Sequence, residues 1–398
     1  MVLIFLPFYL PGFKSGGPVQ AIANLVDQLG ENFEYKIFTS DRDHMEARPY
    51  EGVGINEWNR VENTMVYYCP TGKLSLFVIY KVLSKTQYDV LYMNSFFSPK
   101  FTLAPLLLRR LKLIPQKPVI LAPRGELAPA ALRLKAWKKK PFMLAARLLG
   151  LHYGVTWHAS TWNEKNEIVQ NIASARRVMI AEQIYVAEDL PGLRGNLPER
   201  TNPKQPGRLK IIFLSRICRM KNLELTLDIL SRVKGDISFH IYGPVADSNY
   251  WVRCKRLFRY LPQNVKAEYR GVVNSSEVIQ VLSGYDLFFL PTLGENYGHA
   301  IWEAMIAGCP VLISDRTPWC GLRELGVGWD LPLSEPDVFR QIIEDCAEMD
   351  QEQYLPWSTR AREYGLSKIR STEVLERNIN LFHAALLNGN CPKRHFRL

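Results

Sequence analysis

The chain alternates short apolar runs with stretches at helical spacing, and this alternation restricts its possible folds more than any other feature. In the N-terminal half, the runs that predict buried strands are Val2–Phe8, Tyr35–Thr39, Met65–Tyr68, Val90–Asn94 and Val119–Pro123. Between the first two runs, apolar residues from Ala21 to Leu29 recur at the period of an amphipathic helix. Alternating strands and helices predict an α/β fold, in which helices cover both faces of a parallel sheet.

A second series of the same kind follows the segment Leu190–Lys210, which is rich in proline and glycine and predicts a linker over residues 191–208. The expected strands beyond it are Leu209–Leu214, Ser238–Tyr242, Lys266–Tyr269, Leu287–Leu290 and Val311–Ser314, and the expected helices are Leu223–Lys234, Tyr250–Leu261, Ser276–Ser283 and Gly298–Ala307. We therefore expect two doubly wound domains, 1–190 and 209–370, that face a central cleft at the carboxyl ends of their strands. A C-terminal helix over 371–398 is expected to pack back toward the first domain.

The composition excludes several other classes of protein. With 47% hydrophobic and 22% charged residues, the chain is neither disordered nor fibrous, and no apolar run approaches the roughly 20 residues of a membrane-spanning helix. The apolar start, Met1–Pro7, lacks a basic leader and a cleavage site, so it predicts a strand rather than a signal peptide. The seven cysteines form no Cys-x-x-Cys pair, which disfavours a zinc site or a disulfide framework and favours a reducing cytoplasm.

The positive charge is concentrated in one stretch. Twelve Lys and Arg residues and a single acid, Glu126, lie between Lys100 and Arg147, and this surplus equals the whole formal net charge of +11. A nucleic-acid-binding protein would carry its charge more evenly, and no RNA- or DNA-binding motif is present, so no nucleic-acid partner is expected. A local patch that faces anionic lipid or an anionic substrate fits better.

Part of the basic stretch, Ala130–Leu151, combines its lysines and arginines with Trp137 and several leucines. A basic helix with Trp and Leu on its other side binds at a bilayer interface, although Pro141 is expected to break this one into two pieces. Alternatively, the apolar residues pack on the sheet and the lysines are merely solvated. We favour the membrane interpretation because the charge is so concentrated.

Two glutamates flank the start of an expected helix. Glu295 precedes the loop Asn296–Gly298, and Glu303 projects off the apolar stripe of Gly298–Ala307, so it need not be buried. The backbone amides of the loop would suit an anion, as helix N-termini do. The alternative is an ordinary amphipathic helix with two surface glutamates.

Two cations lie at the end of another expected strand. Leu209–Leu214 delivers Arg216 to its carboxyl end, and Lys221 immediately precedes Asn222, the expected cap of the next helix. Fixed cations beside a helix N-terminus suit a diphosphate, because they bind its charge and stabilise it as a leaving group. The alternative is a solvated basic loop.

Together these segments resemble the retaining glycosyltransferases of family 4, which have the GT-B fold of two Rossmann-like domains. The resemblance covers nearly the whole chain and rests on Glu295 with Glu303, Arg216 with Lys221, Tyr242-Gly243-Pro244, Tyr269-Arg270-Gly271-Val272 and Gly16-Gly17-Pro18. Within the family the chain is most similar to bacterial enzymes of surface-polysaccharide assembly. The segments Thr39–Asp43, Asn94–Pro99 and Ala122–Glu126 carry that narrower likeness.

The resemblance implies roles for individual residues. The catalytic set would be Arg216 and Lys221, which hold the donor diphosphate, with Glu295 at the donor sugar. The donor-binding set would be Gly16, Gly17, Gly243, Gly271, Val272, Asn296, Tyr297, Gly298 and Glu303, the last accepting hydrogen bonds from the ribose. The acceptor-binding set would be Asn94, Arg124 and Glu126.

Two segments depart from the family pattern. Arg124 stands where many members have a histidine that contacts the donor, so it would contact phosphate or acceptor instead, or only brace Glu126. Ala181–Ile184 replaces the usual Pro-Asn-Gly turn near the crossing between the domains. In addition, Asp41-Arg42-Asp43 matches the metal-binding Asp-x-Asp of another glycosyltransferase fold but follows an early strand, so no metal site is expected there.

The expected function is sugar transfer from a nucleoside-diphosphate sugar to an acceptor, with retention of configuration and without a metal or other cofactor. UDP is the first choice of donor nucleotide and GDP the second. The acceptor is expected to be a lipid-linked saccharide for O-antigen, capsule or exopolysaccharide, met by a cytoplasmic protein at the inner face of the plasma membrane. The alternative is a catalytically inactive GT-B subunit that binds a nucleotide sugar.

Overall fold

The computed structural model describes residues 1–12, 14, 17–44, 46–184, 203–369 and 372–389. The chain divides into two units. Unit 1 comprises Met1–Ile184 with Arg370–Leu398, and unit 2 comprises Tyr185–Ile369. Most of the expected linker, residues 191–202, lies outside the described residues. Among the described residues, none of the helices combines the length and the hydropathy that crossing a bilayer requires.

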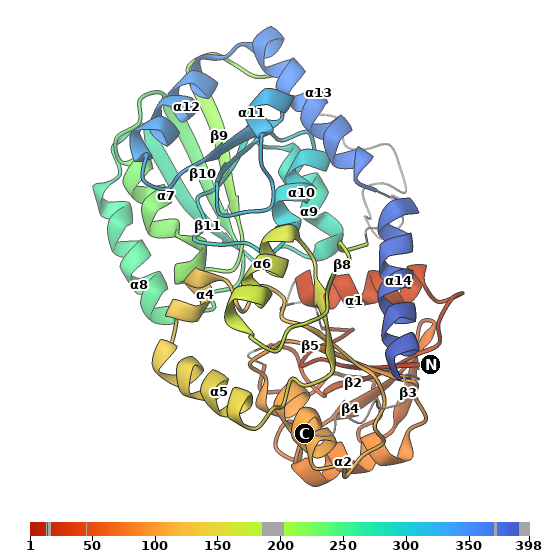
Figure 1. Cartoon of the computed structure of the whole chain (residues 1–398). Coiled ribbons are helices and arrows are strands. Elements are labelled where there is room, and N and C mark those ends of the chain that lie inside the picture. The colour runs from red at the N-terminus through yellow and green to blue at the C-terminus, as the bar shows by residue number, and fades with distance from the viewer. Residues whose placement is uncertain (13, 15–16, 45, 185–202, 370–371, 390–398) are drawn as a thin grey trace. The chain divides into compact units, whose positions relative to one another are not determined.

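Unit 1 is built on a sheet in the order β3-β4-β2-β1-β5-β6-β7-β8 (Figure 1). All neighbouring strands are parallel except β3 and β4, which pair antiparallel. The strands are β1 (Val2–Phe5), β2 (Tyr35–Ser40), β3 (Trp58–Val61), β4 (Thr64–Cys69), β5 (Val90–Asn94), β6 (Val119–Ala122), β7 (Val155–Ala159) and β8 (Val178–Ile180).

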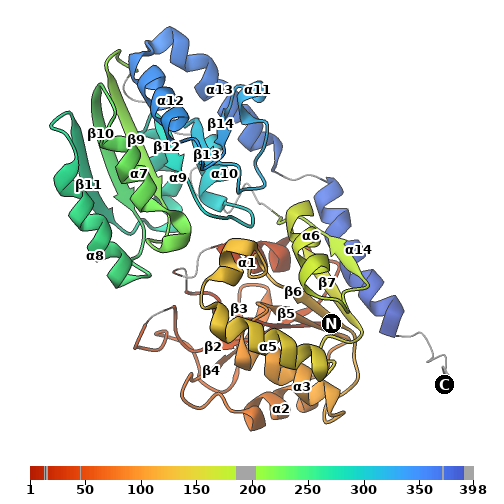
Figure 2. The ribbon, with the colours of Figure 1, turned by 60° about the vertical axis from the view of Figure 1, so that its left-hand side comes forward.

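Helices cover both faces of this sheet because the side chains of each strand point alternately to opposite faces. In β1, Val2 and Ile4 pack with α1 and α14, while Leu3 and Phe5 pack with α2 and α3. Figure 2 shows α2, α3 and α5 together on one side of the sheet. The helices of unit 1 are α1 (Gly17–Gln28), α2 (Leu76–Lys85), the π-helix η1 (Pro99–Leu103), α3 (Ala104–Arg110), α4 (Pro129–Arg133), α5 (Ala136–Leu148), α6 (Trp162–Asn171) and α14 (Thr372–Gly389).

Unit 2 contains a fully parallel sheet in the order β11-β10-β9-β12-β13-β14. Its strands are β9 (Arg208–Leu214), β10 (Asp236–Tyr242), β11 (Val265–Gly271), β12 (Leu287–Leu290), β13 (Val311–Ser314) and β14 (Gly328–Leu331). Its helices are α7 (Leu223–Leu230), α8 (Ser248–Leu257), α9 (Val278–Ser283), α10 (His299–Ile306), α11 (Leu322–Leu325), α12 (Pro336–Glu348) and α13 (Gln351–Ser367). Short 3₁₀ turns occupy η2 (Arg219–Lys221), η3 (Phe258–Tyr260) and η4 (Ser275–Glu277).

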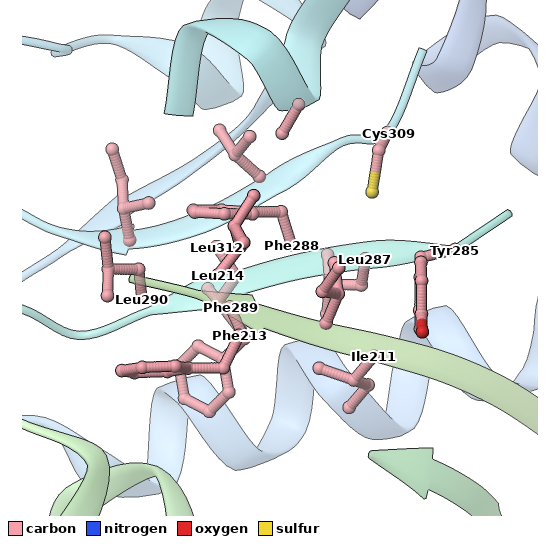
Figure 3. Close-up of a cluster of buried hydrophobic side chains, with 14 of the residues drawn as sticks. Ile211, Phe213, Leu214, Tyr285, Leu287, Phe288, Phe289, Leu290, Cys309 and Leu312 are labelled. Carbon is pink, nitrogen blue, oxygen red and sulfur yellow. The ribbon is translucent and has the colours of Figure 1, made fainter. Parts of the chain in front are cut away.

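The centre of unit 2 is a continuous apolar layer (Figure 3). Every residue of β12 is buried, and Phe213 of β9 lies beside Phe288 and Phe289 of β12 (Figure 3). Strands covered on both faces lose the alternation of polar and apolar residues that half-exposed strands show. This layer holds the ends of β9 and β12 in a fixed relation, which matters for the candidate site at their carboxyl ends.

The expected strands occur, three of them with the expected ends (Val90–Asn94, Leu287–Leu290 and Val311–Ser314) and the others with shifted ends, and one expectation about helices is wrong. Helix α5 runs through Pro141, which was expected to break it. The interruption lies earlier, at Lys135, whose backbone adopts a left-handed conformation with φ of 55° between α4 and α5. Proline in a helix removes one hydrogen bond, and the exposed surface around Pro141 lets water replace it.

Candidate active site

The carboxyl edge of the unit 2 sheet gathers most of the residues singled out in the second half of the sequence. Arg216 follows β9, Gly243 follows β10, Gly271 ends β11 and Glu295 follows β12. Because these strands are parallel, their carboxyl ends lie at one edge, where open α/β sheets bind ligands.

Lys221 and Glu295 form an ion pair at this edge, and their side chains are only 10% and 18% exposed. The loops that carry them are joined by further hydrogen bonds. Asn222 Nδ2 donates to the Pro291 carbonyl at 3.0 Å, and the Leu293 N–H donates to the Met220 carbonyl at 2.8 Å. The structure therefore brings Lys221 and Glu295 together.

Arg216 is exposed, and its guanidinium makes no hydrogen bond or ion pair with the part of the chain that the structure describes. Beside it, the Gly243 N–H donates to the Gly271 carbonyl at 2.7 Å. Gly243 has a φ of 130°, and a Cβ there would lie 2.0 Å from the Ser215 carbonyl oxygen. The backbone next to Arg216 is thus packed too closely for any residue but glycine, while Val272 stays about half exposed.

The loop that precedes α10 is held by residues that follow β13. Trp319 Nε1 donates to the Tyr297 carbonyl at 2.6 Å, and the Glu295 N–H donates to the Arg316 carbonyl at 3.0 Å. Gly298 caps α10 in a left-handed conformation with φ of 86°. The N–H groups of Asn296 and Gly298 have no partner among the described residues, which leaves two donors near the helix N-terminus.

Glu303 lies on α10 and is half-buried. Its neighbours Ala304 and Met305 are fully buried, and burial raises the pKa of Glu303 to about 7. Within the described ranges its carboxylate forms neither an ion pair nor a hydrogen bond. Glu303 is thus not fully buried, as expected, although α10 packs against α13 as well as the sheet.

In unit 1, Asn94 and Arg124 contact each other directly, since Arg124 Nε donates to Asn94 Oδ1 at 3.0 Å. Glu126 is engaged elsewhere: it accepts hydrogen bonds from Ser95 Oγ at 2.9 Å and from the N–H groups of Phe96 and Phe97 at 2.6 and 2.8 Å. Arg124 does not brace Glu126. Instead, Glu126 holds the turn that follows β5.

The remaining candidates differ in how they are placed. Gly16 lies outside the described residues, and Gly17 begins α1. Asp41 pairs with Arg42, while Asp43 accepts hydrogen bonds from the N–H groups of Lys14 and His44, so the Asp-x-Asp carboxylates are engaged by protein donors. Within the described ranges, no three His, Cys, Asp or Glu side chains come together in a way that could hold a metal ion.

Residues 198–363 match the model of the family described as "Glycosyl transferases group 1". An uncharacterized 41.2 kDa protein in the cps region of Klebsiella pneumoniae is 24% identical over 245 residues, which cover 61% of this chain and 64% of that protein. The matched region thus spans less than two thirds of that curated relative's length.

Solved structures match along almost the whole chain. HepE from Anabaena in complex with UDP and glucose superposes with a TM-score of 0.67 at 14% identity, covering 96% of this chain and 98% of that one. WaaG, a glycosyltransferase involved in lipopolysaccharide biosynthesis, superposes with a TM-score of 0.64 at 11% identity, covering 98% and 100%. The chain has the GT-B fold. The two doubly wound parallel sheets of the GT-B fold confirm the expected fold class, and the cleft between them stays a prediction.

The sequence did not predict several residues that hold the candidate site residues at the carboxyl edges of the two sheets of this GT-B chain. Trp319 positions the Tyr297 loop, and Tyr92 and Ser160 contact Arg124. None of the three belongs to a spaced motif. His158 is buried, and its Nδ1 lies 2.6 Å from Tyr92 Oη. Only its place at the end of a strand next to β6 could have signalled this contact.

Proposed function

We propose that this chain is a retaining glycosyltransferase that moves a sugar from a nucleoside-diphosphate sugar to a saccharide acceptor without a bound metal. The observation that carries the proposal is the Lys221–Glu295 pair at the carboxyl edge of the unit 2 sheet, in the same loop region as Arg216, which is exposed and has no partner among the described residues. These residues lie within the region, 198–363, that matches the glycosyl transferases group 1 model. The same region supplies Gly271, where a Cβ would meet no atom within 4 Å, so the backbone there is open to a ligand.

In this proposal, cations and backbone donors act on the donor diphosphate. Arg216 and Lys221 bind its charge, and the N–H groups of Asn296 and Gly298 add donors near the start of α10. Charge develops on the diphosphate as it departs, so groups fixed in advance lower the barrier. Glu295 orients the donor sugar, and Glu303 accepts hydrogen bonds from the ribose. The acceptor attacks from the face that the diphosphate leaves, and a phosphate oxygen takes the acceptor proton.

UDP is the proposed donor nucleotide, with GDP second. The HepE structure, which has the same fold, holds UDP and glucose. We place the acceptor in bacterial surface-polysaccharide synthesis, as a lipid-linked saccharide. The position of the Klebsiella relative in a cps region and the lipopolysaccharide role of WaaG support this choice.

We further propose that α5 places the protein at the inner face of the membrane. Trp137, Leu144 and Leu148 are 74%, 58% and 78% exposed, and their spacing of seven and four residues puts them on one face of the helix. Lys138 and Lys140 are exposed on the same helix. Exposed Trp and Leu among lysines suit an anionic bilayer interface.

A transfer assay tests the proposal. The full chain is incubated with UDP- and GDP-sugars and a lipid-linked saccharide, with and without a chelator, and the anomeric configuration of the product is read by NMR. We expect transfer with retention in the chelator and a loss of at least roughly 100-fold in Lys221→Ala. Arg219→Ala, an exposed arginine of the same loop, is the matched control and should transfer normally. Nucleotide binding with neither transfer nor hydrolysis would overturn the proposal in favour of an inactive nucleotide-sugar-binding subunit.

A further inference from the structure

Arg124 is held rigidly at the carboxyl edge of the unit 1 sheet. It follows β6 in a left-handed conformation with φ of 55°. Its guanidinium donates to Asn94 Oδ1 at 3.0 Å, to Ser160 Oγ at 3.0 Å and to Tyr92 Oη at 2.8 Å. These acceptors come from β5 or from the residues that follow β7, and all three are neutral oxygens.

A second layer of hydrogen bonds fixes Tyr92. His158 Nε2 lies 2.7 Å from the Ala181 carbonyl, which can only accept, so Nε2 carries the proton. Nδ1 then accepts from Tyr92 Oη at 2.6 Å, and the Tyr92 oxygen is left to accept from Arg124. Burial lowers the pKa of His158 to about 3, so the ring stays neutral and this order of donors holds at physiological pH.

No carboxylate neutralises Arg124 through a direct contact among the described residues. Glu126 is engaged by the turn after β5, and Glu164, the other nearby carboxylate, accepts from the N–H groups of Gly125 and Ser160, each at 2.7 Å. Two of the five guanidinium N–H groups therefore remain without a partner in the described part of the chain. Asn94 Nδ2 is also buried without a hydrogen-bond partner there.

We infer that Arg124, supported by Asn94 and Tyr92, binds an oxyanion, a phosphate or a carboxylate, carried by the acceptor. The assignment to the acceptor rests on the proposed function, in which unit 1 holds that substrate. Two parallel N–H groups of a guanidinium match two oxygens of either anion, and such charge-assisted pairs are strong. Backbone strain at Arg124 is of the kind that a functional position retains.

Calorimetric titration of the full chain tests the inference, with inorganic pyrophosphate and glucuronate as separate probes. We expect pyrophosphate to occupy two sites in the wild type. Arg124→Gln should lose one of them, with affinity falling about 10- to 100-fold, and Lys221→Ala should lose the other. Loss of pyrophosphate binding alone in Arg124→Gln assigns a phosphate, and loss of glucuronate binding as well admits a carboxylate. Unchanged binding of both probes in Arg124→Gln would overturn the inference. Unchanged pyrophosphate binding in Lys221→Ala would instead count against the proposed donor site.

Three further variants separate binding from folding. Arg133→Gln removes an exposed arginine of the same basic stretch and should bind both probes normally. Arg124→Lys keeps the charge and should recover part of the affinity. Tyr92→Phe leaves Arg124 in place but frees it from the His158 chain, so affinity should fall less than in Arg124→Gln, by roughly 3- to 10-fold. Equal loss in Arg124→Lys and Arg124→Gln, with thermal stability unchanged, would contradict a charge-based site.

Discussion

The Lys221 ammonium is paired with the Glu295 carboxylate, although 74 residues separate the two in the sequence. The pair forms because β9 and β12 are neighbours in the sheet and end at the same edge. Each partner satisfies the other where little water reaches, so removing one leaves a poorly solvated charge. An incoming diphosphate would meet a lysine that is already positioned by its acid.

Lys221→Ala should reduce kcat/KM for transfer by at least roughly 100-fold, because the departing diphosphate loses a fixed cation. It should also lower the free energy of unfolding by about 1 to 3 kcal/mol, since Glu295 is left unpaired. Steady-state kinetics and urea denaturation measure the two effects.

The double variant Lys221→Met/Glu295→Gln serves as the control for that experiment. It removes both charges, so stability should recover toward that of the wild type while transfer stays lost. Recovery of transfer in the double variant would show that the lysine acts only on the fold.

Glu303→Gln should change the pH dependence of stability. The pKa of about 7 lies above the usual 4.5, so the folded chain holds an extra proton between these values, and stability falls as the pH rises through that window. Glutamine removes the penalty: at pH 8 the variant should be more stable by about 1 to 3 kcal/mol, and at pH 4.5 nearly equal to the wild type. Thermal denaturation across this range gives the comparison.

The same variant tests the ribose contact. Loss of a carboxylate acceptor should raise the donor KM, and the rise should be greatest above pH 7, where the wild-type carboxylate is ionised. A donor KM that Glu303→Gln leaves unchanged from pH 6 to 8 would remove the proposed role.

Gly243→Ala and Gly271→Ala form a matched pair of backbone tests. Both glycines have positive φ, but a Cβ at Gly243 would meet the Ser215 carbonyl oxygen at 2.0 Å, whereas a Cβ at Gly271 would meet no atom within 4 Å. Gly271→Ala should therefore lower the free energy of unfolding by about 1 kcal/mol. Gly243→Ala should lower it by more than about 3 kcal/mol. Urea denaturation of the full chain measures both, and equal losses would contradict the close packing.

Trp137→Ser/Leu148→Ser should weaken co-sedimentation with liposomes that contain anionic lipid by about 10-fold or more, because two exposed anchors are lost. Lys138→Gln/Lys140→Gln should weaken the binding free energy to the same anionic liposomes by about 1 kcal/mol per lysine. Binding of this variant to neutral liposomes should be unchanged. Tyr260→Ser, at a 74% exposed position in unit 2, is the control for exposed aromatic area. Binding that ignores the anionic lipid content would refute the membrane proposal.

The sequence predicted the layers of the fold because buried parallel strands are apolar along their whole length. It missed β7 for a related reason. Thr156 and His158 interrupt the apolar run of β7 although both are buried, and the ring nitrogens of His158 are satisfied by Tyr92 and by the Ala181 carbonyl. Strand β8 is apolar but only three residues long, too short to stand out, and β14 begins with glycine and contains Asp330.

The residues of the candidate donor site were predicted from their places at strand ends and helix starts and from the family resemblance, and the structure adds the contact between Lys221 and Glu295. The hydrogen bonds that hold the Arg124 side chain could not be predicted from the sequence. Tyr92 and Arg124 are 32 residues apart, and Tyr92 and His158 are 66 apart, so only the neighbouring positions of β5, β6 and β7 bring them together.

Unit 1 contains residues from both ends of the chain, and this governs the order in which a ribosome can complete the protein. Leu381, Phe382 and Ala385 of α14 are fully buried in the core formed by β1 and α1. All of unit 2 is synthesised before these residues, so the N-terminal core lacks one of its helices until translation has passed the whole second domain. A chain that stops after α13 would carry a whole second domain and an exposed apolar face on the first, leaving the nascent product open to aggregation and proteolysis.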